Sequence, residues 1–161
     1  MRVLTVKNPW AIFIALGWKG IENRNWPPPA ELIGKRIAIH AGAGQLRPID
    51  MQEITSLLRP RNPQGQLYES FVREFVRLKL PQTLQGYLDL WESMRGRVVA
   101  GVTIKRVHTS RETVPADQRV WWVGKCAWEL VDLQRVSGPV IKGALGLWEL
   151  PKDYRAEKLN G

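Results

Sequence analysis

Cysteine and histidine are scarce in this chain of 161 residues. The one cysteine, Cys126, excludes a disulfide framework and a cysteine-rich zinc site, and it fits a reducing compartment. The two histidines, His40 and His108, do not stand at a zinc-type spacing from other ligands. The sequence therefore predicts no metal site and no cofactor, and we expect a cytoplasmic location.

Long apolar runs and phosphate-binding motifs are also missing. The longest apolar stretch, near residues 9–18, falls well short of the ~20 residues that a membrane span needs. The N-terminus lacks the apolar segment of a signal peptide, so we expect no membrane partner. The "HAGAGQ" at 40–45 lacks a third glycine, and neither a "GxxxxGK[ST]" nor a "GxSxG" pattern occurs.

Positive charge, by contrast, is abundant. The chain has 24 Lys and Arg residues against 15 Asp and Glu, which gives a net charge of +9 spread over both halves. Such a balance favours a polyanionic partner, nucleic acid first, although charge can also serve solubility alone. Hydrophobic residues make up 44% of the chain, which is enough to build the core of one domain, 1–161.

The order of patterns along the chain predicts an α+β fold. Residues rich in β-branched and alternating apolar side chains predict strands at 2–6, 35–40, 97–107, 119–123, 127–136 and 143–150, with 18–26 extended. Helical spacing predicts helices at 9–16, 50–58, 67–77 and 84–91. Helices grouped in the middle of the chain favour an α+β fold, and many short strands favour a small barrel.

Local signals predict where two of these helices begin and end. Asn8 is suited to cap the first helix, Pro9 to its first turn, and Gly17 to the position just past its end. Asp50 and Glu53 form a pair like a capping box at the start of the second helix. The first helix is apolar nearly all round, so it should be buried.

The stretch 17–26, "GWKGIENRNW", concentrates charge and tryptophan beside this apolar helix. On an extended strand, residues two apart share a face, so Glu22 and Arg24 lie together with Trp26. Lys19 falls on the opposite face and joins them only if the chain is still turning after Gly17. The simplest interpretation is a solvent-screened ion pair, which is worth little.

A functional interpretation of the same residues is a pocket for one unstacked base. Arginine offers a planar fork of donors that suits a phosphate or a base edge. Glutamate accepts from an exocyclic amine, and a tryptophan face can stack on a base. Lys19, Glu22, Arg24 and Trp26 together supply these groups.

Five segments in the same order resemble the ASCH domain family, a relative of the PUA fold and more distantly of the YTH and EVE domains. They are "NPWA", "GWKGIENRNW", "GKRIAIHAG", "GKCAWELVDLQRV" and "IKGALGLWELP". The family motif G-x-K-x-x-E-x-R is complete as Gly17, Lys19, Glu22 and Arg24. The resemblance implies a PUA-like β-barrel with flanking helices and a cleft lined by the motif. It covers about 2–44 and 95–151 and leaves the middle, 50–94, as an elaboration.

The resemblance also implies binding of RNA or a nucleotide. Our preferred interpretation is a binding module, with RNA favoured over DNA, that holds an unstacked or modified base. Its cleft residues would be Trp10, Lys19, Glu22, Arg24, Trp26 and His40. Which base is bound, and whether the protein is an oligomer, stay open.

Two alternatives remain. One is a hydrolase on a modified nucleoside or nucleic acid, with Lys19 as base or nucleophile and Glu22 as acid or base. Some family members resemble amidohydrolases of N4-acetylcytidine that use a Lys and a Thr three residues later, whereas here Glu22 stands at the Thr position. This departure argues against that activity, so the chain leans away from an enzyme. The other alternative is a protein-interaction module that uses the middle helices.

Overall fold

The computed structural model describes residues 1–57, 73, 76–77, 79, 81 and 83–159. The strands are β1 (Arg2–Val6), β2 (Ile21–Arg24), β3 (Arg36–Ala41), β4 (Val98–His108), β5 (Cys126–Ser137), β6 (Leu147–Glu149) and β7 (Glu157–Lys158). The α-helices are α1 (Trp10–Ala15), α2 (Pro48–Leu57) and α4 (Leu84–Met94). Three short 3-10 helices are η1 (Ala30–Leu32), η2 (Arg111–Thr113) and η3 (Ala116–Trp121).

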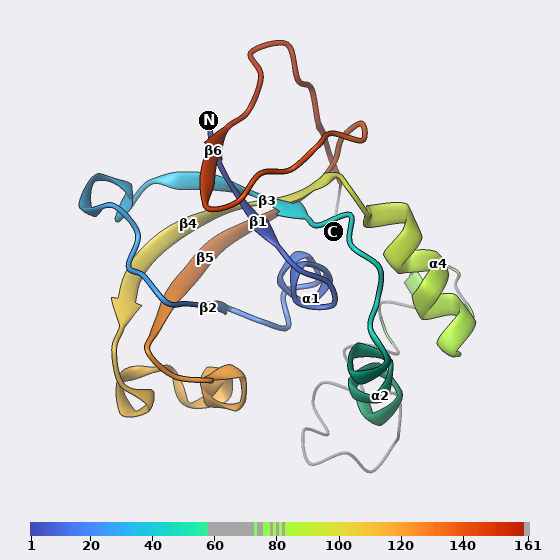
Figure 1. Cartoon of the computed structure of the whole chain (residues 1–161), viewed down its shortest axis with the longest axis horizontal. Coiled ribbons are helices and arrows are strands. Elements are labelled where there is room, and N and C mark those ends of the chain that lie inside the picture. The colour runs from blue at the N-terminus through green and yellow to red at the C-terminus, as the bar shows by residue number, and fades with distance from the viewer. Residues whose placement is uncertain (58–72, 74–75, 78, 80, 82, 160–161) are drawn as a thin grey trace.

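One mixed sheet forms the body of the domain, and it curls around α1 into a partial barrel (Figure 1). The strand order is β2-β5-β4-β3-β1-β6, with β7 paired to β5. Strands β1 and β3 run parallel, and the other pairs are antiparallel. The predicted α+β architecture, a small mixed barrel with flanking helices, is confirmed.

Helix α1 lies in the concave side of the sheet, where it contacts β3, β4 and β5. Its residues 11–15 are all buried, because no face of this short helix carries a charge. Trp128 of β5 is fully buried in the same core, together with Ile and Val side chains from β3 and β4. The predicted burial of this helix is therefore confirmed.

The end of α1 follows the sequence signal, but its start does not. Gly17 adopts φ +79°, and the Trp18 and Gly17 amides donate to Phe13 O and Ile14 O, which is the Schellman arrangement. The prediction that Asn8 caps the helix is wrong, since Pro9 stands at that position without a side-chain hydrogen bond. Asn8 instead donates to Gly42 O at 3.1 Å, a partner that only the folded sheet brings near.

Three further expectations need correction or fall outside the structure. The strand predicted at 119–123 is wrong, because this segment largely belongs to the 3-10 helix η3, which starts after Pro115. Helix α2 starts at Pro48, two residues early, and its Asp50 carboxylate accepts from the Arg47 amide at 2.7 Å. The helix predicted at 67–77 lies mostly outside the described residues.

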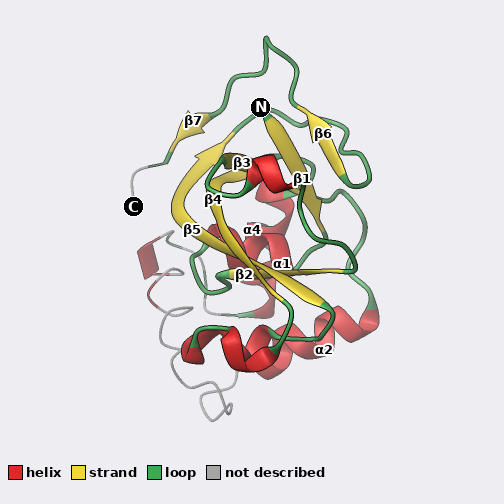
Figure 2. Cartoon of the chain, turned by 90° about the vertical axis from the view of Figure 1, so that its left-hand side faces the viewer, coloured by secondary structure: helices red, strands yellow, loops and turns green. Residues whose placement is uncertain are grey.

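Helices α2 and α4 flank the sheet on one side, as Figure 2 also shows.

Candidate functional site

The turn after α1 decides where Lys19 points. Because the Trp18 and Lys19 amides both donate to Phe13 O, the chain is still turning at this point and enters β2 only at Ile21. The Lys19 side chain therefore reaches the face of β2 that carries Glu22, which strand parity alone would forbid. The turn after Gly17 that this contact of Lys19 with Glu22 requires is therefore present.

Glu22 lies between two cations. Its Oε2 is 2.7 Å from Lys19 Nζ, and its Oε1 is 3.1 Å from Arg24 Nη2. The Lys19 and Glu22 side chains are 4% and 8% exposed, so this is a buried ion pair and not a screened surface pair. Lys19 Nζ also donates to Ile21 O. With two cations and one carboxylate, the cluster has one surplus positive charge.

Burial lowers the pKa of Lys19, and the Glu22 carboxylate acts in the opposite direction. The ammonium donates to two acceptors of the protein itself, and its side chain is almost wholly covered. In this arrangement Lys19 holds Glu22 in place, and it is not presented to a molecule outside.

Arg24 extends from this buried cluster to the surface. Its Nη2 also donates to Thr5 O of β1 at 2.9 Å, and its side chain keeps 21% exposure. Arg24 Nε is buried and has no hydrogen-bond partner among the described residues. The guanidinium is therefore fixed at two points while part of it reaches solvent.

The exposed part of Arg24 lines a pocket of about 360 Å³, which we call the Arg24 pocket. It lies between the end of β2 and the turn before β5, and its lining residues are Asn23, Arg24, Asn25, Trp26, Val123, Gly124 and Lys125. Lys125 is exposed and adds a second cation. The volume falls in the range of small-molecule sites.

Trp26 forms one side of the Arg24 pocket, where Trp128 of the core supports it. The two rings meet edge to face, with centroids 4.9 Å apart. Trp26 O accepts from Trp128 Nε1 at 3.2 Å and from Cys126 Sγ at 3.1 Å. Since the backbone and one ring edge are held, the half-buried Trp26 offers a rigid apolar surface.

Trp10 and His40, the other two site residues predicted from the sequence, lie in different surroundings. Trp10 packs edge to face on Phe13 and Trp121 beside the core. His40 is buried on β3, where its ring nitrogens face Thr5 Oγ1 at 3.3 Å and Ile141 O at 3.0 Å. Neither residue lines the Arg24 pocket.

The hydrogen bonds around His40 also indicate which of its ring nitrogens carries the proton. Trp148 Nε1 donates to Thr5 Oγ1, so the Thr5 hydroxyl is directed to His40 Nδ1. Nδ1 then accepts, and Nε2–H donates to Ile141 O. Burial lowers the pKa of His40, which agrees with a neutral ring that links three strands and the 141 loop.

The far side of the Arg24 pocket was missed by sequence reasoning. This side consists of Val123, which was expected to end a strand at 119–123, and of Gly124 and Lys125, which follow it. The signal that marks this side is the turn dipeptide at 124–125, in which Gly124 has φ +98° and Lys125 φ +61°. Asn23 fixes the segment, because it donates to Trp121 O and accepts from the Val123 amide.

A second buried carboxylate, Glu129, was also missed. It accepts hydrogen bonds from Lys105, Arg106 and His108, all at 2.8 Å. Burial alone would raise its pKa, but these three partners outweigh burial and lower the pKa to about 2.

In the part of the chain that the structure describes, no group of three or more His, Cys, Asp or Glu is placed to hold a metal ion. No described helix is long and apolar enough to cross a membrane.

The comparisons with known proteins found similarity among solved structures. No protein-family model matches the chain, and no curated protein sequence matches it significantly. Among solved structures, the chain is similar to ASCH from Zymomonas mobilis, with 15% sequence identity and a TM-score of 0.44. That match covers 94% of this chain and 88% of the other. A mutant of the same protein matches with 14% identity, the same TM-score and the same coverage.

Both solved structures are ASCH proteins, which is the family that the sequence motifs resemble. At a TM-score of 0.44 the likeness assigns this chain neither a family nor a ligand.

Proposed function

We propose that the chain is a nucleic-acid-binding module that receives an unstacked base of single-stranded RNA in the Arg24 pocket. The observation that carries this proposal is the combination of groups around that pocket. An arginine fork, a lysine, two asparagines and a supported tryptophan line one space of about 360 Å³. A base can stack on Trp26 while Arg24 and Lys125 contact phosphate or a base edge.

The net charge of +9 supports a polyanionic ligand. The Arg24 pocket fits this partner, because it adds two cations and no carboxylate to the surface. Single-stranded RNA is preferred to a duplex, because an unpaired base leaves its stack at a lower free-energy cost than a paired base does.

In this proposal Lys19 and Glu22 are positioning residues. Glu22 orients the Arg24 guanidinium through the 3.1 Å ion pair, and Lys19 holds the Glu22 carboxylate in place through the 2.7 Å ion pair. Binding energy is gained more readily when a guanidinium is already held in its bound geometry. The predicted motif thus acts through one exposed member, Arg24.

The alternative of a hydrolase requires Lys19 or Glu22 to touch a substrate. Both side chains are almost fully covered and engage each other. The geometry therefore favours binding over catalysis. Turnover of N4-acetylcytidine or another modified nucleoside by wild type, with loss in Lys19→Ala, would establish the hydrolase instead.

The test is a titration of fluorescently labelled single-stranded RNA, and of DNA of the same sequence, at several salt concentrations. Trp26→Leu removes the stacking surface, so affinity should fall about 5- to 150-fold, which corresponds to ~1–3 kcal/mol for one stacked base. Trp26→Phe keeps an aromatic face and should lose less. Unfolding curves of each variant show whether the fold is intact.

A charge variant with a matched control tests the rest of the pocket. Lys125→Asn removes one cation but keeps a residue that tolerates the positive φ of this position. It should lower the slope of log affinity against log salt by about 0.7. Lys79→Asn removes the same charge from another exposed position with positive φ that does not line the pocket. Equal effects of the two variants, or no RNA and no DNA binding by wild type, would refute the proposal.

A further inference from the structure

The segment 138–149, which we call the strap, lies across three strands of the sheet. Near its start the Ile141 amide donates to Gly96 O, two residues before β4, at 2.8 Å. The strap then passes the side chains of His40 on β3 and Thr5 on β1, and it ends as β6, which pairs with β1. It therefore crosses β4, β3 and β1 in the order in which they stand in the sheet.

The strap covers a small apolar cluster that is separate from the core around α1. The buried members of this cluster are Val3, Ala38 and Val98, and Trp148 of the strap packs against them. They lie on the face of the sheet opposite α1, since their neighbours along each strand belong to the core around α1. Opening the strap would expose apolar side chains of three strands to water.

A directional chain of hydrogen bonds connects the strap to the sheet through His40. Trp148 Nε1, which can only donate, gives its proton to Thr5 Oγ1 at 3.0 Å. The Thr5 hydroxyl donates to His40 Nδ1 at 3.3 Å, and His40 Nε2–H donates to Ile141 O at 3.0 Å. Trp148 and Ile141 both belong to the strap, so one histidine and one threonine hold two parts of it.

The strap backbone also packs directly on these two side chains. A Cβ at Gly143 would stand 2.7 Å from His40 Nδ1 and 2.8 Å from Thr5 Oγ1, so only a glycine allows the backbone to come this near. The Trp148 ring meets the imidazole edge to face, with centroids 5.7 Å apart. His40 is 1% exposed in this arrangement. The closed strap therefore removes the imidazole from water.

The surroundings of His40 disfavour a charged ring. Burial lowers its pKa, and its hydrogen bonds with backbone groups act in the opposite direction. A second proton, on Nδ1, would meet the Thr5 hydroxyl proton, and among the described residues this hydroxyl bonds only to Trp148 and His40. The described groups that face the ring from each packed element carry no charge: Thr5 of β1, Val98 of β4, Trp148 of β6, and Ile141 and Gly143 of the strap.

We infer that His40 is a proton-sensitive switch, which holds the strap closed while its ring is neutral and releases the strap when the ring is protonated. Once the strap is open, the ring is in water and has the ordinary pKa of 6.5. Because the closed state has the lower pKa, closure is fully favoured above pH 6.5 and weakens as the pH falls below 6.5. The ratio of open to closed molecules increases at most about tenfold for each pH unit, until the pKa of the closed state is reached.

This inference is independent of the proposed function, because neither His40 nor any residue of the strap lines the Arg24 pocket. Failure of RNA binding would leave the switch unaffected, and failure of the switch would leave the Arg24 pocket unaffected.

Amide hydrogen exchange of the whole chain, followed by NMR between pH 7.5 and 5, tests the inference after correction for the intrinsic pH dependence of exchange. The Ile141 amide, which donates to Gly96 O, reports on the strap. We expect its protection factor to fall about tenfold between these two pH values, because protonation of His40 opens the strap. An equal protection factor at both pH values in wild type would overturn the inference without any variant.

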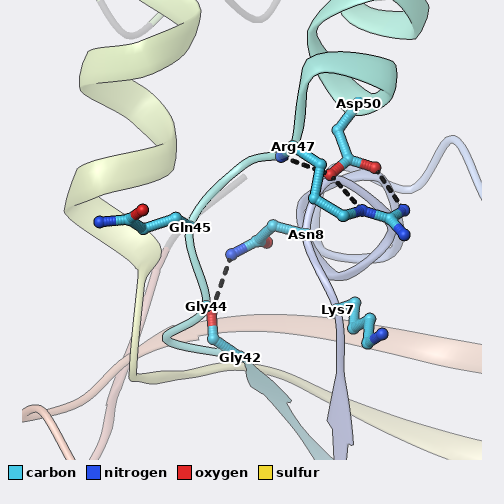
Figure 3. A pocket seen from close by; sticks show the side chains of 7 residues that line it. All are labelled: Lys7, Asn8, Gly42, Gly44, Gln45, Arg47 and Asp50. Atoms are coloured by element: carbon cyan, nitrogen blue, oxygen red, sulfur yellow. Dashed lines mark hydrogen bonds and ion pairs between the residues drawn. The ribbon is translucent and has the colours of Figure 1, made fainter.

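The Gly42 amide provides an internal control two residues after His40. It donates to Val6 O at 2.9 Å, and Gly42 O accepts from Asn8 Nδ2 at 3.1 Å, as Figure 3 shows. Neither partner belongs to the strap, so the protection of this amide should change less than about twofold. An equal fall at Gly42 and Ile141 would show that acid opens the sheet as a whole, and the assignment to the strap would then be wrong.

The two histidines of the chain allow a matched pair of variants. His40→Gln keeps one acceptor and one donor in a side chain that does not titrate, so the Ile141 protection factor should no longer depend on pH. His108→Gln removes the other histidine, on β4, and should keep the wild-type dependence. The inference fails if His40→Gln, with a folded spectrum, retains the tenfold fall, or if His108→Gln abolishes it.

Discussion

Replacing Lys19 by methionine tests the assignment of a buried ion pair to the motif. Methionine keeps an unbranched apolar side chain of similar length but removes the ammonium. The Glu22 carboxylate, 8% exposed, would lose its partner at 2.7 Å and keep only Arg24 at 3.1 Å. An uncompensated buried charge is destabilising, because the interior does not solvate it as water does.

The size of the effect follows from the geometry. Breaking a buried pair by removing one partner costs about 3–5 kcal/mol, and the remaining Arg24 places this case near the lower end. For a chain of this length, ~3 kcal/mol corresponds to a decrease in Tm of about 6–12 °C. The same substitution at a surface pair has a much smaller effect. Arg2→Met is the matched control, since Arg2 and Glu149 are 40% and 62% exposed, and it should change stability by less than ~1 kcal/mol.

Urea unfolding followed by tryptophan fluorescence measures these differences. The double variant Lys19→Met with Glu22→Gln removes both charges and should be more stable than the sum of the single effects predicts, by about 1 kcal/mol or more. If Lys19→Met costs no more than Arg2→Met, or if the single effects simply add, Lys19 and Glu22 are not a coupled buried pair. The positioning role that we give to them would then be wrong.

Three further predictions concern buried polar groups and close packing. The pKa of Glu129 is about 2 in the folded state against 4.5 in the unfolded state, so its contribution to stability should be complete above pH 4.5 and fall by ~3 kcal/mol as the pH falls to 2. Acid unfolding of Glu129→Gln should lack this pH dependence. Burial lowers the pKa of His40, so NMR titration should find a neutral Nε2–H ring that gains its proton below pH 6.5, and a midpoint at or above 6.5 would contradict this. A Cβ at Gly143 would stand 2.6 Å from His40 Cε1, so Gly143→Ala should lower the free energy of unfolding in urea by about 1–3 kcal/mol. Gly44→Ala, at a position with open space around it, should lower it by less than ~1 kcal/mol. Equal losses in the two variants would refute the packing argument.

Local patterns in the sequence predicted the parts of the fold that local physics determines. The strand at 2–6 and the end of the first helix at Gly17 were right, because alternation and a left-handed glycine act over a few residues. The strand predicted at 119–123 was wrong because Pro115 and the polar residues after it start a 3-10 turn that the β-branched pattern conceals. The family resemblance supplied the expectation of a β-barrel with flanking helices, whereas the strand order was not predicted.

The candidate site was predicted in part. Parity placed Glu22 and Arg24 on one face, and the condition on Lys19 was correct. Whether these side chains are open or covered depends on tertiary structure. Strand β5 pairs with β2, and Trp121 of η3 donates to Trp18 O, and both elements lie about a hundred residues away in the sequence. For the same reason the contact of Asn8 with Gly42 was not predicted, and the turn signal at 124–125 did not show that Lys125 lines the Arg24 pocket.

The hydrogen bond from Arg24 to Thr5 has a consequence for the closure of the barrel. Strand β2 is at one end of the sheet order, and β1 lies next to the other end. Strand β6 pairs with β1 only as far as Leu4, so Thr5 O lies just past that ladder. Strands β2 and β1 are not paired through their backbones, and the Arg24 guanidinium connects them by its hydrogen bond to Thr5 O. The proposed RNA ligand would therefore contact, at Arg24, a side chain that also joins β2 to β1.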